Sequence, residues 1–156
     1  MVKDNQNPQK IADLIVQLKK RKLPVIDRQA GVNEIIDAFV ASNHSRILYV
    51  VDKEQRLKGV LSLGNLVRHV FFHYHDPSID SRSLVSMFVS ETADDFMQRE
   101  PVCAMPSENV RDVLQRMIDH NTKEIPIVDS SMRVVADLTI IDLLHHYKPI
   151  KAQDMS

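Results

Sequence analysis

Two polar residues three positions apart, Thr139 and Asp142, stand where an apolar, β-branched run ends and helical spacing of apolar residues begins. This pattern predicts a buried strand that passes directly into a helix. The first turn of a helix offers unpaired main-chain N–H groups and the positive end of the helix dipole, which stabilise anions. A hydroxyl can contact a phosphate or a sugar, and a carboxylate one turn later can accept hydrogen bonds from two neighbouring hydroxyls. The junction is therefore a candidate ligand site.

The same spacing has a purely structural interpretation. Thr139-x-x-Asp142 matches a capping box in which Asp replaces Glu. For an isolated pair of this kind, capping is the more frequent role.

The junction occurs twice in the chain. Ser62 and Asn65 lie 77 positions before the junction pair (139 − 62 = 77), and Asp52 lies the same distance before Asp129. The helical patterns upstream repeat at an offset of 78, from Val32 to Val110. Two copies of one unit therefore fill most of the chain.

Each copy is predicted to run strand, helix, strand, strand, helix, which is an α+β pattern. The first copy has predicted strands at 23–26, 46–51 and 57–61, with helices at 32–43 and after residue 62. The second has strands at 102–105, 125–128 and 134–138, with helices at 110–121 and 140–147. A short amphipathic helix is predicted at 10–20, and 93–99 parallels it. We expect these inward-facing residues on the helix at 110–121: Val110, Val113, Leu114, Met117 and Ile118.

The domain organisation follows from these repeats. Residues 1–156 are expected to form a single pair of motifs, with the first motif and its lead-in helix at 10–75, a connector at 76–92 and the second motif at 93–149. A run of four cations, 19–22, ends the lead-in helix, and we interpret it as a solvated helix end rather than an anion site.

The composition limits the classes of function. The chain has 20 Lys and Arg against 21 Asp and Glu, so it lacks the charge expected of a protein that binds nucleic acid or a membrane surface. Its one cysteine, Cys103, cannot pair within the chain, which suits a structural role in a reducing compartment. Neither a signal peptide nor a spanning segment is expected, and the expected location is cytoplasmic.

The motifs of both copies resemble the CBS (cystathionine β-synthase) domain pair, or Bateman module. In the first copy they are YVVD at 49–52 and GVLSLGN at 59–65, and in the second IPIVD at 125–129 and ADLTIID at 136–142. The resemblance covers nearly the whole chain. It implies tandem repeats packed about a pseudo-two-fold axis, with clefts between them for adenosine-containing ligands such as AMP, ADP, ATP, S-adenosylmethionine, NAD or cyclic dinucleotides.

The resemblance also implies roles for particular residues. In such a site Asp142 would hold the ribose hydroxyls, and Thr139 would contact ribose or phosphate. The main chain of the opening strand would pair with the adenine edge, and an apolar residue with a proline would line the base pocket. The residues that carry these two roles here are Val102, Cys103, Ala104, Ile125 and Pro126.

The two copies differ where the resemblance places the ligand. In the first copy Asn65 replaces the ribose-binding Asp and Tyr49 replaces the proline, so this site, with Val25 and Ser62, is expected to be the weaker one. The second copy has Ala136 for the usual Gly, an acid at 137 inside the strand, and no Arg just before Asp142. Phosphate contacts would then come from other residues, for which the candidates are His145, His146 and Lys148.

Three functions remain open at this stage. The first is a regulatory protein without enzymatic activity or bound cofactor, which binds an adenosine-containing ligand and acts on an unknown partner. The second is a ligand-free dimerisation or partner-binding module. With any of these functions we expect a homodimer, since the helices carry more apolar residues, such as Phe71, Phe72, Met117 and Leu144, than one sheet face can cover. The third is a metal-responsive protein that uses His69 and His73, one helical turn apart. For catalysis the sequence offers no nucleophile with a base and no Gly-rich phosphate loop, with 3 Gly in the chain.

Overall fold

The computed structural model describes residues 10–18, 20–42, 45–74 and 76–147, with main chain alone at 72–74, 84, 87–90 and 147. The chain divides into two compact units. We call 24–101 the first-repeat unit, and 1–23 together with 102–156 the second-repeat unit. Each is described in turn.

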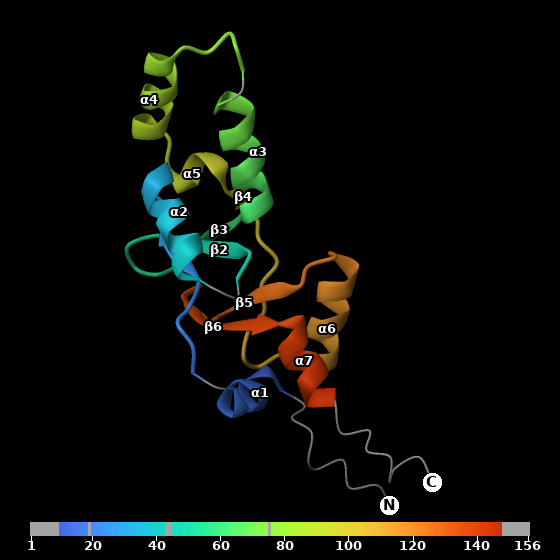
Figure 1. Ribbon diagram of the computed structural model, residues 1–156. Helices are drawn as coiled ribbons and strands as arrows, with labels where there is room; N and C mark the ends of the chain where they lie inside the picture. The colour runs from blue at the N-terminus through green and yellow to red at the C-terminus, as the bar shows by residue number, and fades with distance from the viewer. Residues whose placement is uncertain (1–9, 19, 43–44, 75, 148–156) are drawn as a thin grey trace, which may run out of the picture. The chain divides into compact units, whose positions relative to one another are not determined.

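The first-repeat unit contains a four-stranded sheet with helices packed against it. Its strands, in the order β1-β2-β3-β4, are β1 (Val25–Asp27), β2 (Ile47–Val51), β3 (Leu57–Ser62) and β4 (Gln98–Arg99). Strand β1 is parallel to β2, and the other neighbours are antiparallel. The helices are α2 (Val32–Ala41), α3 (Leu63–Tyr74), α4 (Ser81–Ser90) and α5 (Ala93–Phe96). Helix α2 is the crossover that a parallel pair needs, and α3 leaves the end of β3 without a loop (Figure 1).

The core of this unit follows from the alternation of apolar residues. Along β3 every second side chain is buried, whereas β2 is buried over its last four residues. Leu48, Val50 and Leu61 on the strands pack with Ile35 of α2 and Leu66 of α3. One apolar stripe from α2 and one from α3 therefore pack against the sheet.

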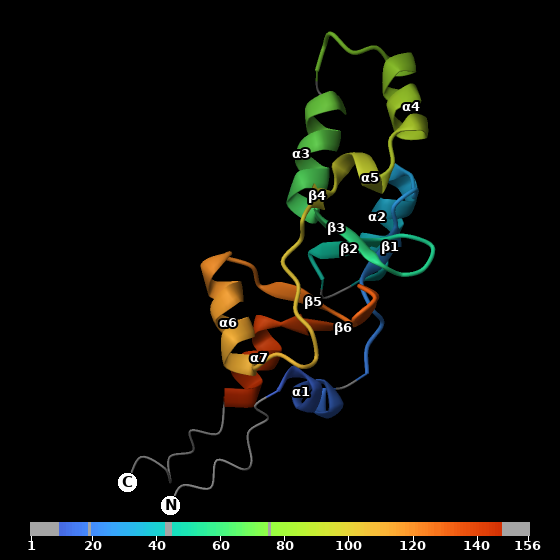
Figure 2. The ribbon, with the colours of Figure 1, turned by 180° about the vertical axis from the view of Figure 1, so that it is seen from behind.

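In its described residues, the second-repeat unit contains a two-stranded antiparallel sheet and three helices. Its elements are α1 (Ile11–Gln17), α6 (Val110–Asp119), β5 (Glu124–Val128), β6 (Val134–Thr139) and α7 (Ile140–Tyr147). Helices α6 and α7 lie side by side on one side of the sheet, as both views show (Figures 1 and 2). Ile11 and Leu14 of α1 join Val113, Met117 and Leu143 in one buried cluster.

Each lead-in helix packs within the unit of the other repeat. Helix α1 precedes the first repeat, yet Ile11 N donates to Glu108 O at 2.9 Å in the second-repeat unit. Helix α5 precedes the second repeat, yet Ala93 N donates to Ala30 O at 2.9 Å in the first-repeat unit. The second-repeat unit is consequently assembled from two separate stretches of chain.

The Asp that ends each repeated Val-Asp motif builds a turn. Asp52 Oδ1 accepts from the main-chain N–H groups of Glu54 and Arg56, both at 3.0 Å. Asp129 Oδ1 does the same with Ser131 at 2.8 Å and Arg133 at 3.0 Å. Within each turn one residue takes a left-handed conformation, Gln55 and Met132, both with φ of 67°. These aspartates therefore shape the two hairpins.

The structure departs from the sequence analysis at the predicted strand 102–105. It is reduced to a single parallel bridge between Ala104 and Ile127. In the first-repeat unit Tyr49 N donates to Pro24 O at 2.7 Å and begins the β1–β2 ladder. The equivalent position is Pro126, which has no N–H to donate. The prediction of a strand there was wrong because one donor is missing.

The inward-facing residues predicted on α6 are confirmed in part. Val110, Val113 and Met117 are buried and Leu114 is half-buried, but Ile118 is 60% exposed. The buried stripe of α6 is therefore narrower than its apolar pattern.

Gly59 of β3 gives a test of packing in the first-repeat unit. A Cβ there would lie 2.6 Å from Met97 Sδ and 2.8 Å from Gln98 O, so the β3–β4 pair would have to move. We expect Gly59→Ala to lower the free energy of unfolding by about 1–3 kcal/mol in urea titrations. Gly64→Ala is the control, because only the flexible end of Arg68 lies near it, and on a helix it should be neutral or stabilising by up to about 1 kcal/mol. Equal effects at the two sites would contradict the close β3–β4 contact.

Candidate functional site

The junction of β6 and α7 contains the capping box that its spacing suggests. Thr139 N donates to Asp142 Oδ2 at 2.8 Å, and Asp142 N donates to Thr139 Oγ1 at 3.1 Å. Ile140 N, the first N–H of α7, donates to Lys123 O at 2.8 Å. The cap predicted at this position is confirmed, and it fixes both side chains at the mouth of the helix.

A third residue, Arg21, completes the junction. Its guanidinium forms a fork on Asp142, with Nη1 at 3.2 Å from Oδ1 and Nη2 at 2.6 Å from Oδ2. Nη2 also donates to Asp137 O at 2.9 Å and lies 3.6 Å from Asp137 Oδ2. The Arg21 side chain is 40% exposed, whereas those of Asp142 and Asp137 are 13% and 5% exposed. One solvent-accessible cation therefore covers two largely buried carboxylates.

These contacts set the charges of the junction. Partial burial raises the pKa of Asp142, but hydrogen bonds from Arg21 and Thr139 outweigh it and hold the pKa below its ordinary value. The hydrogen bond to Asp142 in turn raises the pKa of Arg21. Asp142 is accordingly ionised at neutral pH and is an acceptor only.

Arg21 was missed by the sequence analysis, which assigned the cationic run 19–22 to a solvated helix end. That interpretation was wrong for Arg21. The repeat offset of 77 aligns Arg21 with Gln98 of β4, and the equivalent of Asp137 is Val60, the strand partner of Gln98. In the first-repeat unit a short strand pairs at this edge, and in the second-repeat unit the Arg21 side chain bonds the edge carbonyl instead. The alignment is a signal that could have identified the residue.

The main chain near the junction is held by a second arginine. Arg116 Nη1 donates to Cys103 O at 2.8 Å, and its guanidinium also pairs with Glu108. Ala104 N donates to Pro126 O at 3.1 Å. Among the described residues, no hydrogen bond to the main-chain N–H of Val102 or Cys103 is recorded. Burial raises the pKa of the Cys103 thiol, so it is neutral and a poor nucleophile.

The other predicted site residues of the second repeat lie around this junction or within the core. Ile125 is fully buried in the core and Pro126 is buried. His145 is exposed on α7, and His146 is half-buried, with a pKa lowered by burial. Lys148 lies outside the described residues. The structure thus brings together Thr139 and Asp142 and adds Arg21 and Asp137. The ligand-binding roles of all the predicted site residues stay predictions.

The first-repeat junction has half of this arrangement. Asn65 N donates to Ser62 Oγ at 3.0 Å, and the Asn65 carbonyl oxygen accepts from Arg68 Nη2, one turn along the same helix. Tyr49 is fully buried, and Val25 is half-buried on β1. The acceptor here is a neutral amide, which gives weaker hydrogen bonds than a carboxylate.

The histidine pair on α3 has a packing role at one of its members. His69 Nε2 lies 2.8 Å from Glu91 Oε2, and its ring meets Phe96 edge to face at 4.4 Å. The side chain of His73 lies outside the described residues. Within the described part of the chain, no group of three His, Cys, Asp or Glu residues could hold a metal ion. Likewise, no described helix is long and apolar enough to cross a membrane.

The charge of Asp142 should appear in the pH dependence of stability. Asp142→Asn keeps the size of the side chain but removes its charge, so we expect the free energy of unfolding at pH 7 to fall by about 1–3 kcal/mol. The folded-state pKa lies below the ordinary 3.8. The wild-type advantage is therefore complete above about pH 5 and is lost as pH falls through the folded-state pKa. Urea titrations at pH 7 and pH 3 measure it.

The control for this experiment is Asp37→Asn, on the exposed face of α2. It should change stability by less than about 0.5 kcal/mol at either pH. A difference between wild type and Asp142→Asn that is the same at pH 3 and pH 7 would contradict the charged contacts of Asp142.

Comparison with known proteins places this geometry in a family. The model of the CBS domain matches residues 11–71 and 93–149. A CBS domain-containing protein of Thermotoga maritima has a TM-score of 0.71 at 24% identity, covering 91% of this chain and 96% of that one. CBSX2, a CBS-pair protein of Arabidopsis thaliana, has the same TM-score in its complex with AMP, at 19% identity, covering 92% and 99%.

Two further relatives differ in how much of their length is shared. The CBS domain pair of protein MJ0100, solved with 5′-methylthioadenosine and S-adenosyl-L-methionine, has a TM-score of 0.68 at 20% identity, covering 92% of this chain and 100% of that one. An uncharacterized 33.4 kDa protein in a ribosomal RNA operon of Thermofilum pendens is 22% identical over 125 residues, and the chain spans 42% of its length. With more than half of its residues matched in two segments, this α+β chain of tandem repeats belongs to the CBS domain family.

Proposed function

We propose that this protein is a regulatory module without enzymatic activity that binds an adenosine-containing ligand at the junction of β6 and α7. The observation that carries the proposal is the Asp142 carboxylate. It is ionised, positioned by Thr139 and Arg21, and still 13% exposed at the start of a helix. A fixed carboxylate of this kind is suited to accept hydrogen bonds from the two hydroxyls of a ribose.

The surrounding residues would supply the rest of the ligand contacts. Thr139 Oγ1 lies at the same mouth and can contact ribose or phosphate. The main-chain N–H groups of Val102 and Cys103 can pair with the edge of adenine, because no hydrogen bond to them is recorded in the described residues. Pro126 would line the pocket for the adenine base. The polar contacts needed for an adenosyl group are therefore available within one unit.

Relatives support this ligand class. Their structures were solved with AMP and with 5′-methylthioadenosine and S-adenosyl-L-methionine, which share an adenosine moiety. We propose the same class here, in a cytoplasmic protein that regulates an unknown partner. We place the ligand at the second repeat because Asn65 offers the first repeat a neutral acceptor, whose hydrogen bonds are weaker than those of the Asp142 carboxylate.

The two junctions can be ranked by matched substitutions. We expect Asp142→Ala to weaken binding of AMP or S-adenosylmethionine by about 2–4 kcal/mol, because two ribose hydroxyls lose a charged acceptor. Asn65→Ala should cost about 1 kcal/mol or less. Titration calorimetry gives the dissociation constants, with circular dichroism to show that both variants are folded. Equal losses, or a larger one for Asn65→Ala, would place the ligand at the other junction.

A second function, self-association, is favoured by the exposed apolar residues of both units. Val67 on α3 and Leu144 on α7 occupy equivalent positions and are 53% and 63% exposed. Val40 and Ile118 are a second such pair on α2 and α6. Met117, which the sequence analysis counted among the surplus apolar residues, is buried in the core, and the Phe72 side chain lies outside the described residues. The same surface positions are apolar in both repeats, as a repeated contact requires.

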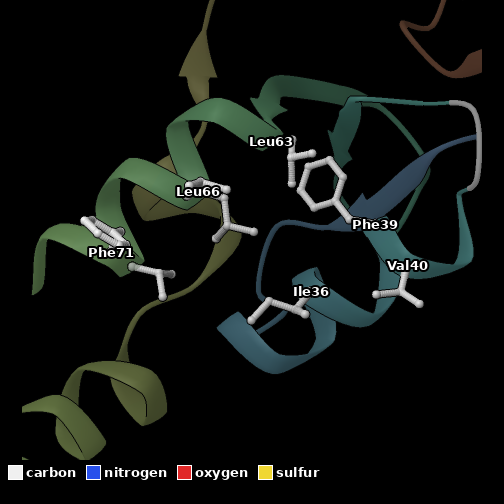
Figure 3. A pocket seen from close by; sticks show the side chains of 8 residues that line it. Ile36, Phe39, Val40, Leu63, Leu66 and Phe71 are labelled. Carbon is white, nitrogen blue, oxygen red and sulfur yellow. The ribbon is translucent and has the colours of Figure 1, made fainter. Parts of the chain in front are cut away.

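In the first-repeat unit these residues border an apolar pocket of about 440 Å³. It lies between α2 and α3, with Ile36, Phe39 and Val40 on one side and Leu63 and Leu66 on the other (Figure 3). Exposed apolar surface of this kind is costly in a monomer. We propose that a second copy of the chain covers it, so that the protein is a homodimer.

Charged substitutions test the dimer. We expect Val67→Glu or Leu144→Glu to shift the wild-type dimer toward monomer at micromolar concentration, because each would bury an unpaired charge. Light scattering coupled to gel filtration measures the mass. Val16→Glu is the matched control, since Val16 is 84% exposed on α1, outside this surface, and should leave the dimer intact. A monomeric wild type would reject the proposal.

A further inference from the structure

The carboxylate proposed to bind ribose is already occupied by Arg21. Asp142 Oδ1 accepts from Arg21 Nη1, and Oδ2 accepts from Arg21 Nη2 and from Thr139 N. A carboxylate offers about four acceptor positions, so these contacts use most of them. Two ribose hydroxyls can bind only if Arg21 gives up at least one of its bonds. The ligand and Arg21 thus compete for the same oxygens.

Arg21 would remain beside the ligand after such an exchange. Its Nη2 is also bonded to Asp137 O at 2.9 Å, so the guanidinium has a second attachment that does not involve Asp142. The side chain is 40% exposed, so a change of rotamer would move it toward solvent rather than into the core. Of its five N–H donors, Nε–H and one on Nη1 have no recorded partner among the described residues. The displaced group would therefore present several donors next to the ribose.

The cost of displacement depends on what the ligand carries. Adenosine, which has no phosphate, would replace Arg21 on the Asp142 carboxylate. The guanidinium would then lose its two hydrogen bonds to Asp142 and gain no acceptor in return. A 5′-phosphate is held close to the ribose by its own covalent structure and matches the guanidinium fork as a carboxylate does. With a nucleotide, the Arg21–Asp142 pair is exchanged for an Arg21–phosphate pair and Asp142–ribose bonds. No charge is left without a partner.

We infer that Arg21 is the residue that makes this site selective for 5′-phosphorylated adenosine over adenosine itself. The inference rests on the proposed function, and it names both the ligand class and the residue that selects it. Of the candidate residues on α7, His146 is less suited to this role, because burial lowers its pKa and favours its neutral form at pH 7. Lys20 and Lys22 flank Arg21 and are exposed, with no recorded contact to the junction within the described residues.

The test compares AMP with adenosine. Titration calorimetry on the full chain at about pH 7.5 gives the dissociation constants of AMP and adenosine for wild type and for Arg21→Ala. We expect wild type to prefer AMP by about tenfold or more, and Arg21→Ala to bring that preference close to one. Adenosine binding should change by less than about threefold or become tighter, since its competitor is gone. Lys20→Ala and Lys22→Ala are matched controls and should keep at least half of the preference.

Folding is controlled by a second variant. Arg21 also lies beside the largely buried Asp137 carboxylate. Arg21→Ala removes this cation and is therefore expected to lower the stability of the fold as well. Arg21→Gln keeps donors for the Asp137 carbonyl while removing the charge, and it should show the same loss of preference. Circular dichroism melts identify which variant is folded.

The outcomes separate this inference from the proposed function. If wild type binds neither AMP nor adenosine, the proposed function fails and the inference fails with it. If both bind but wild type does not prefer AMP, or the folded variants keep the preference, the adenosine site stands and the role of Arg21 is rejected. If the lysine controls lose the preference as fully as Arg21→Ala, the effect belongs to the charge of the whole segment, and the inference is again rejected.

Discussion

The second-repeat unit depends on how two largely buried carboxylates are compensated. Asp137 and Asp142 are 5% and 13% exposed, and a carboxylate in such a place destabilises the fold unless donors surround it. For Asp142, Arg21 and the main chain of Thr139 provide those donors. The Asp137 carboxylate lies 3.6 Å from the same guanidinium. The same contacts connect the segment after α1 to the start of α7. The Arg21–Asp142 pair therefore stabilises the unit, and it is also the pair whose hydrogen bonds the proposed ligand would have to replace.

The two repeats show how similar backbones can carry different chemistry. Both junctions cap a helix with a hydroxyl, and both helices receive a main-chain carbonyl at their first N–H, from Arg46 in one and Lys123 in the other. Three residues after the hydroxyl, one repeat has the neutral amide of Asn65 and the other the ionised carboxylate of Asp142. At the sheet edge one repeat pairs a short strand and the other an arginine side chain. The two repeats therefore share a framework but differ in the polar groups that it carries.

Much of the fold could be predicted from the sequence because its determinants are local. The apolar periods and the 77-residue offset gave the order of helices and strands, and the spacing of Thr139 and Asp142 gave the capping box. The prediction of a strand at 102–105 was wrong because Pro126, in the neighbouring strand β5, has no main-chain N–H to donate. Arg21 was missed because its partner lies 121 residues away, and helix-end statistics describe only near neighbours. Whether α1 packs on its own repeat or the other is likewise set by tertiary contacts.

The exchange of lead-in helices has a consequence for the order in which the chain acquires its structure. The first-repeat unit is continuous, 24–101, so all the residues of its core have been synthesised once Met97 has emerged. The second-repeat unit is interrupted, since Ile11 and Leu14 pack in one cluster with buried residues between Ala104 and Leu143. During synthesis the apolar face of α1 therefore has no core partners until the whole first-repeat unit, and then the residues that follow it, have been made. Contacts across so long a separation form slowly, so we expect the core of the second-repeat unit to be completed after that of the first-repeat unit.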